Sequence, residues 1–332
     1  MSNEKREIAF KAEHVTMDFK VSGKSVFSKT KTLRALNDVS FELYKGESLA
    51  VVGESGCGKS TICRIAMLFH GPSSGKMYFG EEDVHQLKGD RLKNYRQKAQ
   101  MIFQDPFSAL NPLHSIYYHL SRPIQLYHKG TKEEMQQKMD ETLELVGLTP
   151  AQEQGAKFPH QLSGGQKQRA YIARVLAAGA EVIFADEPTS MLDVSIRLGV
   201  LNLMNELKTK FGKSFIYITH DIATARYFAD RIIVLYAGHI VEYGDVNEVI
   251  INPKHPYTQL LVAVAPDPER EGELVIPVKS TEESEISMWT PESKGCPFKH
   301  RCLYATEKCF AEMPGETQVG ENQFIRCHHP KL

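Results

Sequence analysis

The chain of 332 residues has no run of about 18 apolar residues, so the sequence predicts no membrane-spanning helix. Its first residues, Met-Ser-Asn-Glu-Lys-Arg, contain no apolar segment, and we expect no secretory signal. A net charge of −1 gives no general attraction to nucleic acid. Internal repeats and low-complexity tracts are also missing. These absences indicate a globular protein of a reducing compartment, where six cysteines favour metal binding over disulfides.

A glycine-rich loop carries the strongest signal in the chain. Residues 53–60 read Gly-Glu-Ser-Gly-Cys-Gly-Lys-Ser, between the apolar run 49–52 and a helical segment. A strand, a G-x-x-x-x-G-K-S loop and a helix in this order are typical of a P-loop that binds a nucleoside triphosphate. We expect Lys59 to reach the β- and γ-phosphates and Ser60 to bind Mg²⁺. The predicted nucleotide contacts are consecutive residues: Gly53, Glu54, Ser55, Gly56, Cys57, Gly58, Lys59, Ser60 and Thr61.

Polar residues that suit nucleotide hydrolysis follow three other apolar runs. Asp186 and Glu187 end the run 182–185; the first is expected to hold Mg²⁺ and the second to polarise an attacking water. His220 follows the next run and could bind the γ-phosphate, although a histidine at a strand end is more often structural. Gln104 closes a third run and could direct its amide oxygen to Mg²⁺. One carboxylate after a strand would be weak evidence for nucleotide hydrolysis, whereas two downstream of a P-loop are strong evidence.

A second anion-binding segment lies at residues 162–166, Leu-Ser-Gly-Gly-Gln, ahead of an expected helix at 167–178. Its residues Ser163, Gly164, Gly165 and Gln166 would form a helix N-terminus suited to phosphate. One active site with its own P-loop does not need this segment. A dimer does need it, if each chain closes the nucleotide of its partner with Ser163 and Gly165.

The rest of the pattern predicts an α/β fold. Short apolar runs across residues 8–52 indicate an antiparallel β layer, with an exposed loop at 22–32. The runs 182–185 and 215–218 indicate buried parallel strands, with a helix between them that begins after Asp193. Residues 131–146 are expected to form an amphipathic helix with Thr131 and Glu134 as a capping box, and Ala237-Gly238 to turn a hairpin.

Four cysteines lie in a short C-terminal tail, which follows a proline-rich stretch at 252–275 that we take as a boundary. Cys296, Cys302, Cys309 and Cys327 are separated by five, six and seventeen residues. Four thiolates can bind zinc or a [4Fe–4S] cluster, and the short C-x₂₋₄-C pair common in zinc sites is absent. Free thiols remain a third reading. Cys57 is interpreted as a small filler of the loop and Cys63 as packed core.

Together these motifs resemble the ATP-binding subunits of ABC transporters, over almost the whole chain. The resemblance rests on the P-loop, Gln104, Leu-Ser-Gly-Gly-Gln, Asp186-Glu187, Ser190-Met-Leu-Asp193 and His220. It implies a P-loop NTPase core with an antiparallel β subdomain, a helical subdomain at about 105–178 and a small cysteine-containing C-terminal extension. The ATP-binding domain would cover 1–252 and the extension 253–332.

The same resemblance assigns further roles. Catalysis would use Glu187, His220 and Lys59, and Asp193 would lie in the loop that couples the two sites of a dimer. Phe19 resembles the aromatic residue that stacks on adenine, with Phe27 as a competitor.

Three segments look like the oligopeptide/dipeptide subfamily of bacterial importers: residues 102–112, residues 252–261 and Cys296-Pro-Phe-Lys-His-Arg-Cys302. This implies a [4Fe–4S] cluster on the four tail cysteines and a place on the cytoplasmic face of the cell membrane. The implied partners are a paralogous ATPase subunit, two permease subunits and an extracytoplasmic substrate-binding protein. Some relatives import oligosaccharides or nickel, and Met191 and Arg197-Leu-Gly199 depart from the usual pattern, so the substrate stays open.

Two other functional classes fit the sequence less well. A soluble ABC ATPase that acts on DNA or ribosomes would be expected to carry a coiled coil, a second ATPase unit or a basic arm, and none is present. A regulatory module with a dead site conflicts with intact Lys59, Asp186, Glu187 and His220. For the transporter class, the apolar residues within 105–128 are either a permease-docking patch or subdomain core: Phe107, Leu110, Leu113, Ile116, Tyr117 and Tyr118.

Overall fold

The computed structural model describes residues 6–21, 31–265 and 289–330. The chain forms two compact units, which interleave along the sequence. The first takes Met1–Ala9, Tyr44–Glu47 and Gln86–Ile216, and the second takes Phe10–Leu43, Ser48–His85 and Tyr217–Leu332. Within the described ranges, no helix is both long and apolar enough to cross a membrane.

The second unit contains an antiparallel sheet. Its strand order is β2-β1-β4-β5, made from β2 (Lys31–Tyr44), β1 (Ile8–Val21), β4 (Ser74–Phe79) and β5 (Glu82–Asp83). Strand β1 pairs with β4, with Phe10 opposite Phe79. The antiparallel layer predicted from residues 8–52 is thus present, but the prediction was wrong for its last part. Residues 48–52 form β3, which pairs in parallel with β9 in another sheet. The expected loop at 22–32 lies mostly outside the described residues, and Lys31 and Thr32 already belong to β2.

The larger sheet of the second unit places the P-loop. It runs in the order β11-β12-β10-β9-β3-β8, with β3 (Ser48–Val52) buried along its whole length. The other strands are β8 (Ser214–Thr219), which begins in the first unit, β9 (Arg231–Tyr236), β10 (His239–Asp245), β11 (Glu316–Gln318) and β12 (Gln323–Arg326). The helices of the second unit are α1 (Lys59–Ala66), η1 (Val84–Gln86), α9 (Ile222–Phe228), α10 (Val246–Ile251), α11 (Pro256–Val264) and α12 (Glu307–Ala311).

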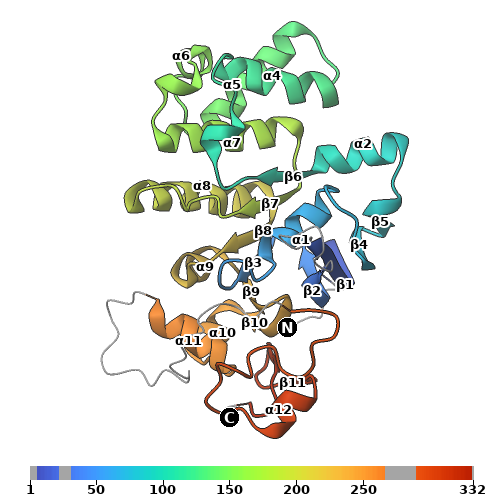
Figure 1. Ribbon diagram of the computed structural model, residues 1–332. Coiled ribbons are helices and arrows are strands. Elements are labelled where there is room, and N and C mark those ends of the chain that lie inside the picture. Colours follow the sequence, from blue (N-terminus) through green and yellow to red (C-terminus); the bar gives the residue numbers. More distant parts are fainter. Residues whose placement is uncertain (1–5, 22–30, 266–288, 331–332) are drawn as a thin grey trace. The chain divides into compact units, whose positions relative to one another are not determined.

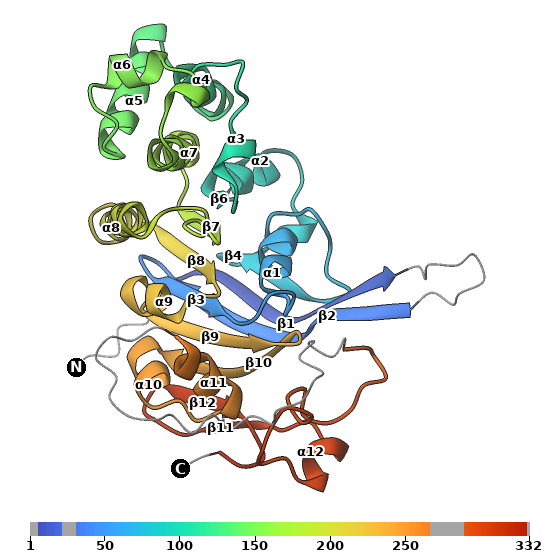
Figure 2. The same ribbon diagram turned by 60° about the vertical axis from the view of Figure 1, so that its left-hand side comes forward.

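The C-terminal tail continues this sheet. Strand β12 pairs antiparallel with β10, with Tyr243 opposite Phe324, and their rings stack at 5.0 Å between centroids. Figure 2 shows β12 and β11 beside β10. The predicted hairpin is confirmed: β9 and β10 pair antiparallel, and Ala237 and Gly238 turn between them with φ of 45° and 79°.

The first unit pairs two parallel strands, β6 (Ala99–Ile102) and β7 (Val182–Asp186), with Ile102 opposite Ala185. Its helices are α2 (Gly89–Lys98), α3 (Pro106–Ala109), α4 (Ile116–Tyr127), α5 (Lys132–Leu145), α6 (Ala151–Ala156), η2 (Pro159–Gln161), α7 (Gly164–Ala178) and α8 (Val194–Phe211). Helices α4, α5, α6 and α7 gather into one bundle (Figure 1).

Local signals in this unit behave as expected. The capping box of α5 is confirmed, since Glu134 donates its amide N–H to Thr131 Oγ1 at 3.2 Å and accepts the Thr131 N–H at 2.8 Å. The strands predicted from 182–185 and 215–218 are β7 and β8, and α8 begins directly after Asp193.

The apolar stretch within 105–128 divides between core and surface. Leu110 and Ile116 are buried, and Tyr117 packs its ring against Gly155 and hydrogen-bonds Asp140. Leu113 and Tyr118 are 79% and 41% exposed. Subdomain core and surface are therefore both represented, and the side chain of Phe107 lies outside the described residues.

Candidate functional site

The P-loop backbone requires glycine at its first and sixth positions. Gly53 and Gly58 have φ of 155° and 109°, where side chains are strained. A Cβ at Gly53 would collide with the Leu235 carbonyl oxygen, and one at Gly58 with that of Ala35. Helix α1 follows at once, so the loop ends at a helix N-terminus, which suits an anion.

Lys59 is held over the loop that precedes it. Its Nζ donates to the carbonyl oxygens of Gly53 at 2.7 Å and Glu54 at 2.9 Å, and the residue is 5% exposed. Cys57 is 1% exposed, and burial raises the pKa of its thiol. The interpretation of Cys57 as a filler is confirmed, and Cys63 is fully buried as predicted.

Glu54 makes two contacts that no sequence motif predicted. Its carboxylate accepts hydrogen bonds from both terminal nitrogens of Arg301, at 2.8 and 3.0 Å. Its amide N–H donates to the Tyr257 hydroxyl at 2.8 Å. Both partners come from the C-terminal part of the chain, Tyr257 from α11 and Arg301 from the cysteine tail. The quoted segments 252–261 and 296–302 contained these residues, but nothing in them pointed to the P-loop.

Two other predicted nucleotide residues lie in the second unit. His220 is exposed and directly follows β8. The next residue, Asp221, caps α9, because its carboxylate accepts hydrogen bonds from the amides of Ala223 and Thr224. Phe19 is half-buried near the end of β1 and contacts His70 edge-on, with 5.8 Å between ring centroids. Its competitor Phe27 lies outside the described residues.

In the first unit, Asp186 of the predicted acidic pair ends β7 and Glu187 directly follows it. Asp186 and Glu187 are half-buried, and Glu187 has a φ of 47°. The Gln104 side-chain amide donates to Glu187 Oε2 at 3.0 Å, so the structure brings these two predicted residues together. This bond uses the amide nitrogen of Gln104 and leaves its oxygen for the role predicted at a metal.

The Leu-Ser-Gly-Gly-Gln segment starts helix α7 earlier than predicted. The helix begins at Gly164 instead of residue 167, because Ser163 and Gln166 form a capping box. The Ser163 N–H donates to Gln166 Oε1 at 3.0 Å, and the Gln166 N–H donates to Ser163 Oγ at 3.3 Å. Gly165 packs against Ile196 of α8, where a Cβ would not fit. Ser163 is exposed at this helix N-terminus.

Asp193 is the exposed N-cap residue that directly precedes α8. Around it, Met191, Val194 and Leu198 are 53%, 78% and 47% exposed. Three apolar side chains in one segment are more than scattered surface residues and mark a surface suited to a protein partner.

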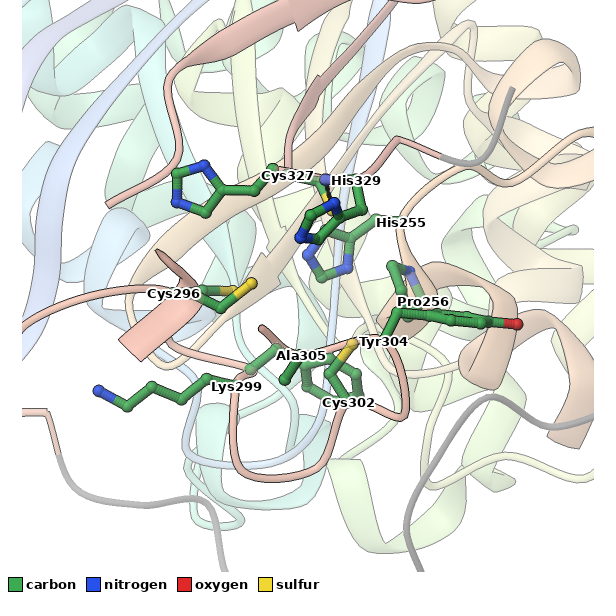
Figure 3. A pocket seen from close by; sticks show the side chains of 12 residues that line it. His255, Pro256, Cys296, Lys299, Cys302, Tyr304, Ala305, Cys327 and His329 are labelled. Atoms are coloured by element: carbon green, nitrogen blue, oxygen red, sulfur yellow. Dashed lines mark hydrogen bonds between the residues drawn. The ribbon is translucent and has the colours of Figure 1, made fainter. Parts of the chain in front are cut away.

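The four tail cysteines line one pocket of the second unit. Figure 3 shows Cys296, Cys302 and Cys327 around it, together with His255 and His329; Cys309 lines the same pocket. All four are free of disulfides. Burial, followed by the neighbouring thiols, raises the pKa of Cys296 to about 12 and that of Cys327 to about 11. Their thiolates therefore need a compensating positive charge. Among the described residues, no group of three or more His, Cys, Asp or Glu has an arrangement that could hold a metal ion.

Comparison with known families matches both parts of the chain. A family model for the ABC transporter matches residues 36–190, and one for the oligopeptide/dipeptide transporter, C-terminal region, matches residues 241–309. The first range contains the P-loop, Gln104, the Leu-Ser-Gly-Gly-Gln segment and Glu187, and the second contains Tyr257 and Arg301.

Similar proteins agree. Di/tripeptide transport ATP-binding protein DppF of Pseudomonas aeruginosa is 38% identical over 97% of this chain and 98% of its own length. Oligopeptide transport ATP-binding protein AppF of Bacillus subtilis is 38% identical over 90% of this chain and 91% of its own. A solved dimeric structure of the ATP-binding cassette MJ0796 in a post-hydrolysis state, bound to ADP and Pi, matches with a TM-score of 0.61 and 32% identity, over 71% of this chain and 98% of that one. The family and fold predicted from the sequence are confirmed: the chain belongs to the ATP-binding proteins of ABC transporters, is an ATPase, and carries the C-terminal region of the oligopeptide/dipeptide group.

Proposed function

We propose that this ATPase energises the import of oligopeptides or dipeptides through a membrane permease. The observation that carries the proposal is the near full-length similarity to proteins named for peptide transport, including the C-terminal region at 241–309. Oligosaccharides and nickel are the alternative substrates. The substrate is selected elsewhere in such importers, because the ATPase subunit does not contact it.

The proposed nucleotide site is completed by a second ATPase chain. One chain supplies the P-loop, with Lys59 on the β- and γ-phosphates, and the other supplies Ser163 and Gly165. Mg²⁺ would be held by Ser60, Asp186 and Gln104, and Phe19 would stack on adenine. Glu187 would act as general base with His220 as its orienting partner. In this scheme residues 1–252 are the ATP-binding domain, with a helical subdomain at about 105–178, and residues 253–332 are the extension.

Exposed apolar residues support the proposed partners. Met191, Val194 and Leu198 surround Asp193, and we assign this surface to the second ATPase chain, a paralogue. Leu113 and Tyr118 are assigned to one of two permease subunits, since large exposed apolar side chains favour protein contacts. A substrate-binding protein outside the cell would deliver the peptide, and this chain would lie on the cytoplasmic face of the membrane.

Uptake measurements test the substrate. In cells that lack this chain, we expect uptake of labelled di- and oligopeptides to fall to background and uptake of nickel and oligosaccharide to stay normal. Restoring the chain should restore peptide uptake. Selective loss of nickel or oligosaccharide uptake would replace the proposed substrate, and normal uptake of all three would argue against import of these classes.

We also propose that Cys296, Cys302, Cys309 and Cys327 hold a [4Fe–4S] cluster. They line one pocket, and at least three of them are buried. Zinc is the alternative for four thiolates, and the short C-x₂₋₄-C pair common in zinc sites is absent from the tail. Four cysteine thiolates are the usual ligands of a [4Fe–4S] cluster, and the segment Cys296-Pro-Phe-Lys-His-Arg-Cys302 resembles the iron–sulfur segment of peptide-importer ATPases. When bound, the cluster would fasten the short tail, and electron transfer does not follow from it.

Metal analysis after anaerobic purification tests the cluster. We expect a brown protein with about four irons per chain, and a Cys302→Ser variant with a much lower iron content. Cys63→Ser is the matched control, because this buried cysteine lies outside the pocket and should not change the iron content. Stoichiometric zinc without iron would contradict the proposal, and so would a metal-free folded protein with four reduced thiols.

A further inference from the structure

The second residue of the P-loop, Glu54, is bound at each of its polar groups. Its amide N–H donates to the Tyr257 hydroxyl at 2.8 Å, and its carbonyl oxygen accepts from Lys59 Nζ at 2.9 Å. Its carboxylate accepts two hydrogen bonds from Arg301, at 2.8 and 3.0 Å. Glu54 is thus the point where the C-terminal region meets the lysine that the P-loop uses for phosphate.

One peptide group shows the connection most directly. In the peptide bond between Gly53 and Glu54, the N–H donates to the Tyr257 hydroxyl at 2.8 Å. The carbonyl oxygen of the same bond accepts from Lys59 Nζ at 2.7 Å. A P-loop binds phosphate with backbone amides, so the direction of each peptide plane affects the site. Tyr257 therefore helps to set the orientation of this peptide plane, to which Lys59 is bound.

Arg301 reaches Glu54 from a packed aromatic environment. Its guanidinium lies 5.7 Å from the centre of the Tyr236 ring and 5.6 Å from that of Phe298. The Arg301 side chain is 16% exposed, and a two-pronged bond to a carboxylate fixes orientation as well as distance. Tyr257 is fully buried and packs on the same two rings, at 4.6 and 5.4 Å. Both side chains are therefore packed on the same two rings that lie beside their bonds to Glu54.

We propose that Arg301 and Tyr257 are positioning residues for ATP: by holding Glu54 they set the geometry of the P-loop and Lys59, so the C-terminal region forms part of the nucleotide site of its own chain. The same two residues adjoin the cysteine pocket. Cys302 follows Arg301, and His255 stands two positions before Tyr257; both line that pocket (Figure 3). The inference depends on ATP binding, and it depends neither on the transported substrate nor on a metal in the pocket.

Steady-state ATPase kinetics of the full chain separate positioning from simple fastening of the tail. A positioning role predicts that Arg301→Ala raises the KM for ATP about tenfold and leaves kcat within about twofold, because a charged hydrogen bond is lost while Glu187 is untouched. A role in folding alone would lower the amount of active protein, and so kcat, without moving KM. ATP binding measured by titration should weaken by the same factor as KM rises.

Further variants keep the test decisive. Glu54→Gln retains the shape of the side chain, Tyr257→Phe removes only the hydroxyl, and each should raise KM several-fold. The double variant Arg301→Ala/Glu54→Gln should be no worse than Arg301→Ala, because both changes break one contact. Arg301→Lys should recover part of the loss. Arg326→Ala is the control, since Arg326 pairs with Glu316 at 3.8 Å in the same tail, and its KM should not change.

Three outcomes would overturn the inference. The first is a KM within twofold of the parent for both Arg301→Ala and Tyr257→Phe. The second is additive effects in the double variant. The third is a fall in kcat at constant KM. If Arg301→Ala does not fold, Glu54→Gln and Tyr257→Phe decide the question with nearly unchanged volumes.

Discussion

Replacing Glu187 with Gln is expected to lower the ATPase kcat roughly 10²- to 10⁴-fold, the range attributed to general base catalysis. The substitution keeps the shape of the side chain and removes its basicity. Glu187 directly follows β7, and Gln104 donates a hydrogen bond to its carboxylate at 3.0 Å, so the site should stay intact around the new amide. ATP binding should persist, and ATP-bound dimers should accumulate because turnover stops.

Phosphate release and size-exclusion chromatography with ATP measure the two parts of this prediction. The matched control is Glu181→Gln, the same change directly before β7, where Glu181 forms an exposed ion pair with Lys98 at 3.0 Å. Its kcat should match the parent, since exposed ion pairs contribute little. Hydrolysis at the normal rate in Glu187→Gln would reject Glu187 as the base and turn attention to His220 or Asp186.

Local features of the fold could be predicted because they depend on neighbours in the sequence. The capping box of Thr131 and Glu134 involves residues three apart, and the strands at 182–185 and 215–218 are continuous apolar runs. The start of α7 was placed too late, although Ser163 and Gln166 form the same kind of box. The prediction placed the two glycines ahead of the helix, whereas both belong to its first turn and Gly165 packs closely on Ile196.

Long-range features were harder for a physical reason. The apolar run 49–52 has the same kind of sequence as the strands of the antiparallel sheet. Its pairing with β9, about 180 residues away, places it in the larger sheet instead. The contact between Glu54 and Arg301 joins residues 247 positions apart. No periodicity or spacing encodes such a pair, since it exists only once α11 and the tail have packed around Tyr236 and Phe298. The sequence therefore predicted the chemistry of the P-loop without the groups that hold it.

Replacing Lys59 with Ala is expected to weaken ATP binding about 10²-fold or more and to abolish substrate uptake. The buried ammonium group is the only charged partner that the P-loop itself offers to the phosphates, and a charged hydrogen bond at such a site contributes about 1.5–3 kcal/mol. The loss has a second part here. Lys59 Nζ also binds the carbonyl oxygens of Gly53 and Glu54, which would lose their partner and let the loop relax.

Because Lys59 also holds the loop, the Lys59→Ala variant can show whether Arg301 acts through Lys59. Lys76→Ala on β4 removes an exposed lysine of the same unit and serves as the control, with unchanged ATP binding and uptake. If Lys59 acts on ATP alone, Arg301→Ala in the Lys59→Ala background should still weaken binding by its own factor. If Glu54 transmits the effect of Arg301 to Lys59, the Arg301 substitution should add little once Lys59 is gone, because coupled residues are not additive. ATP affinity within twofold of the parent in Lys59→Ala would contradict the assignment of the P-loop itself.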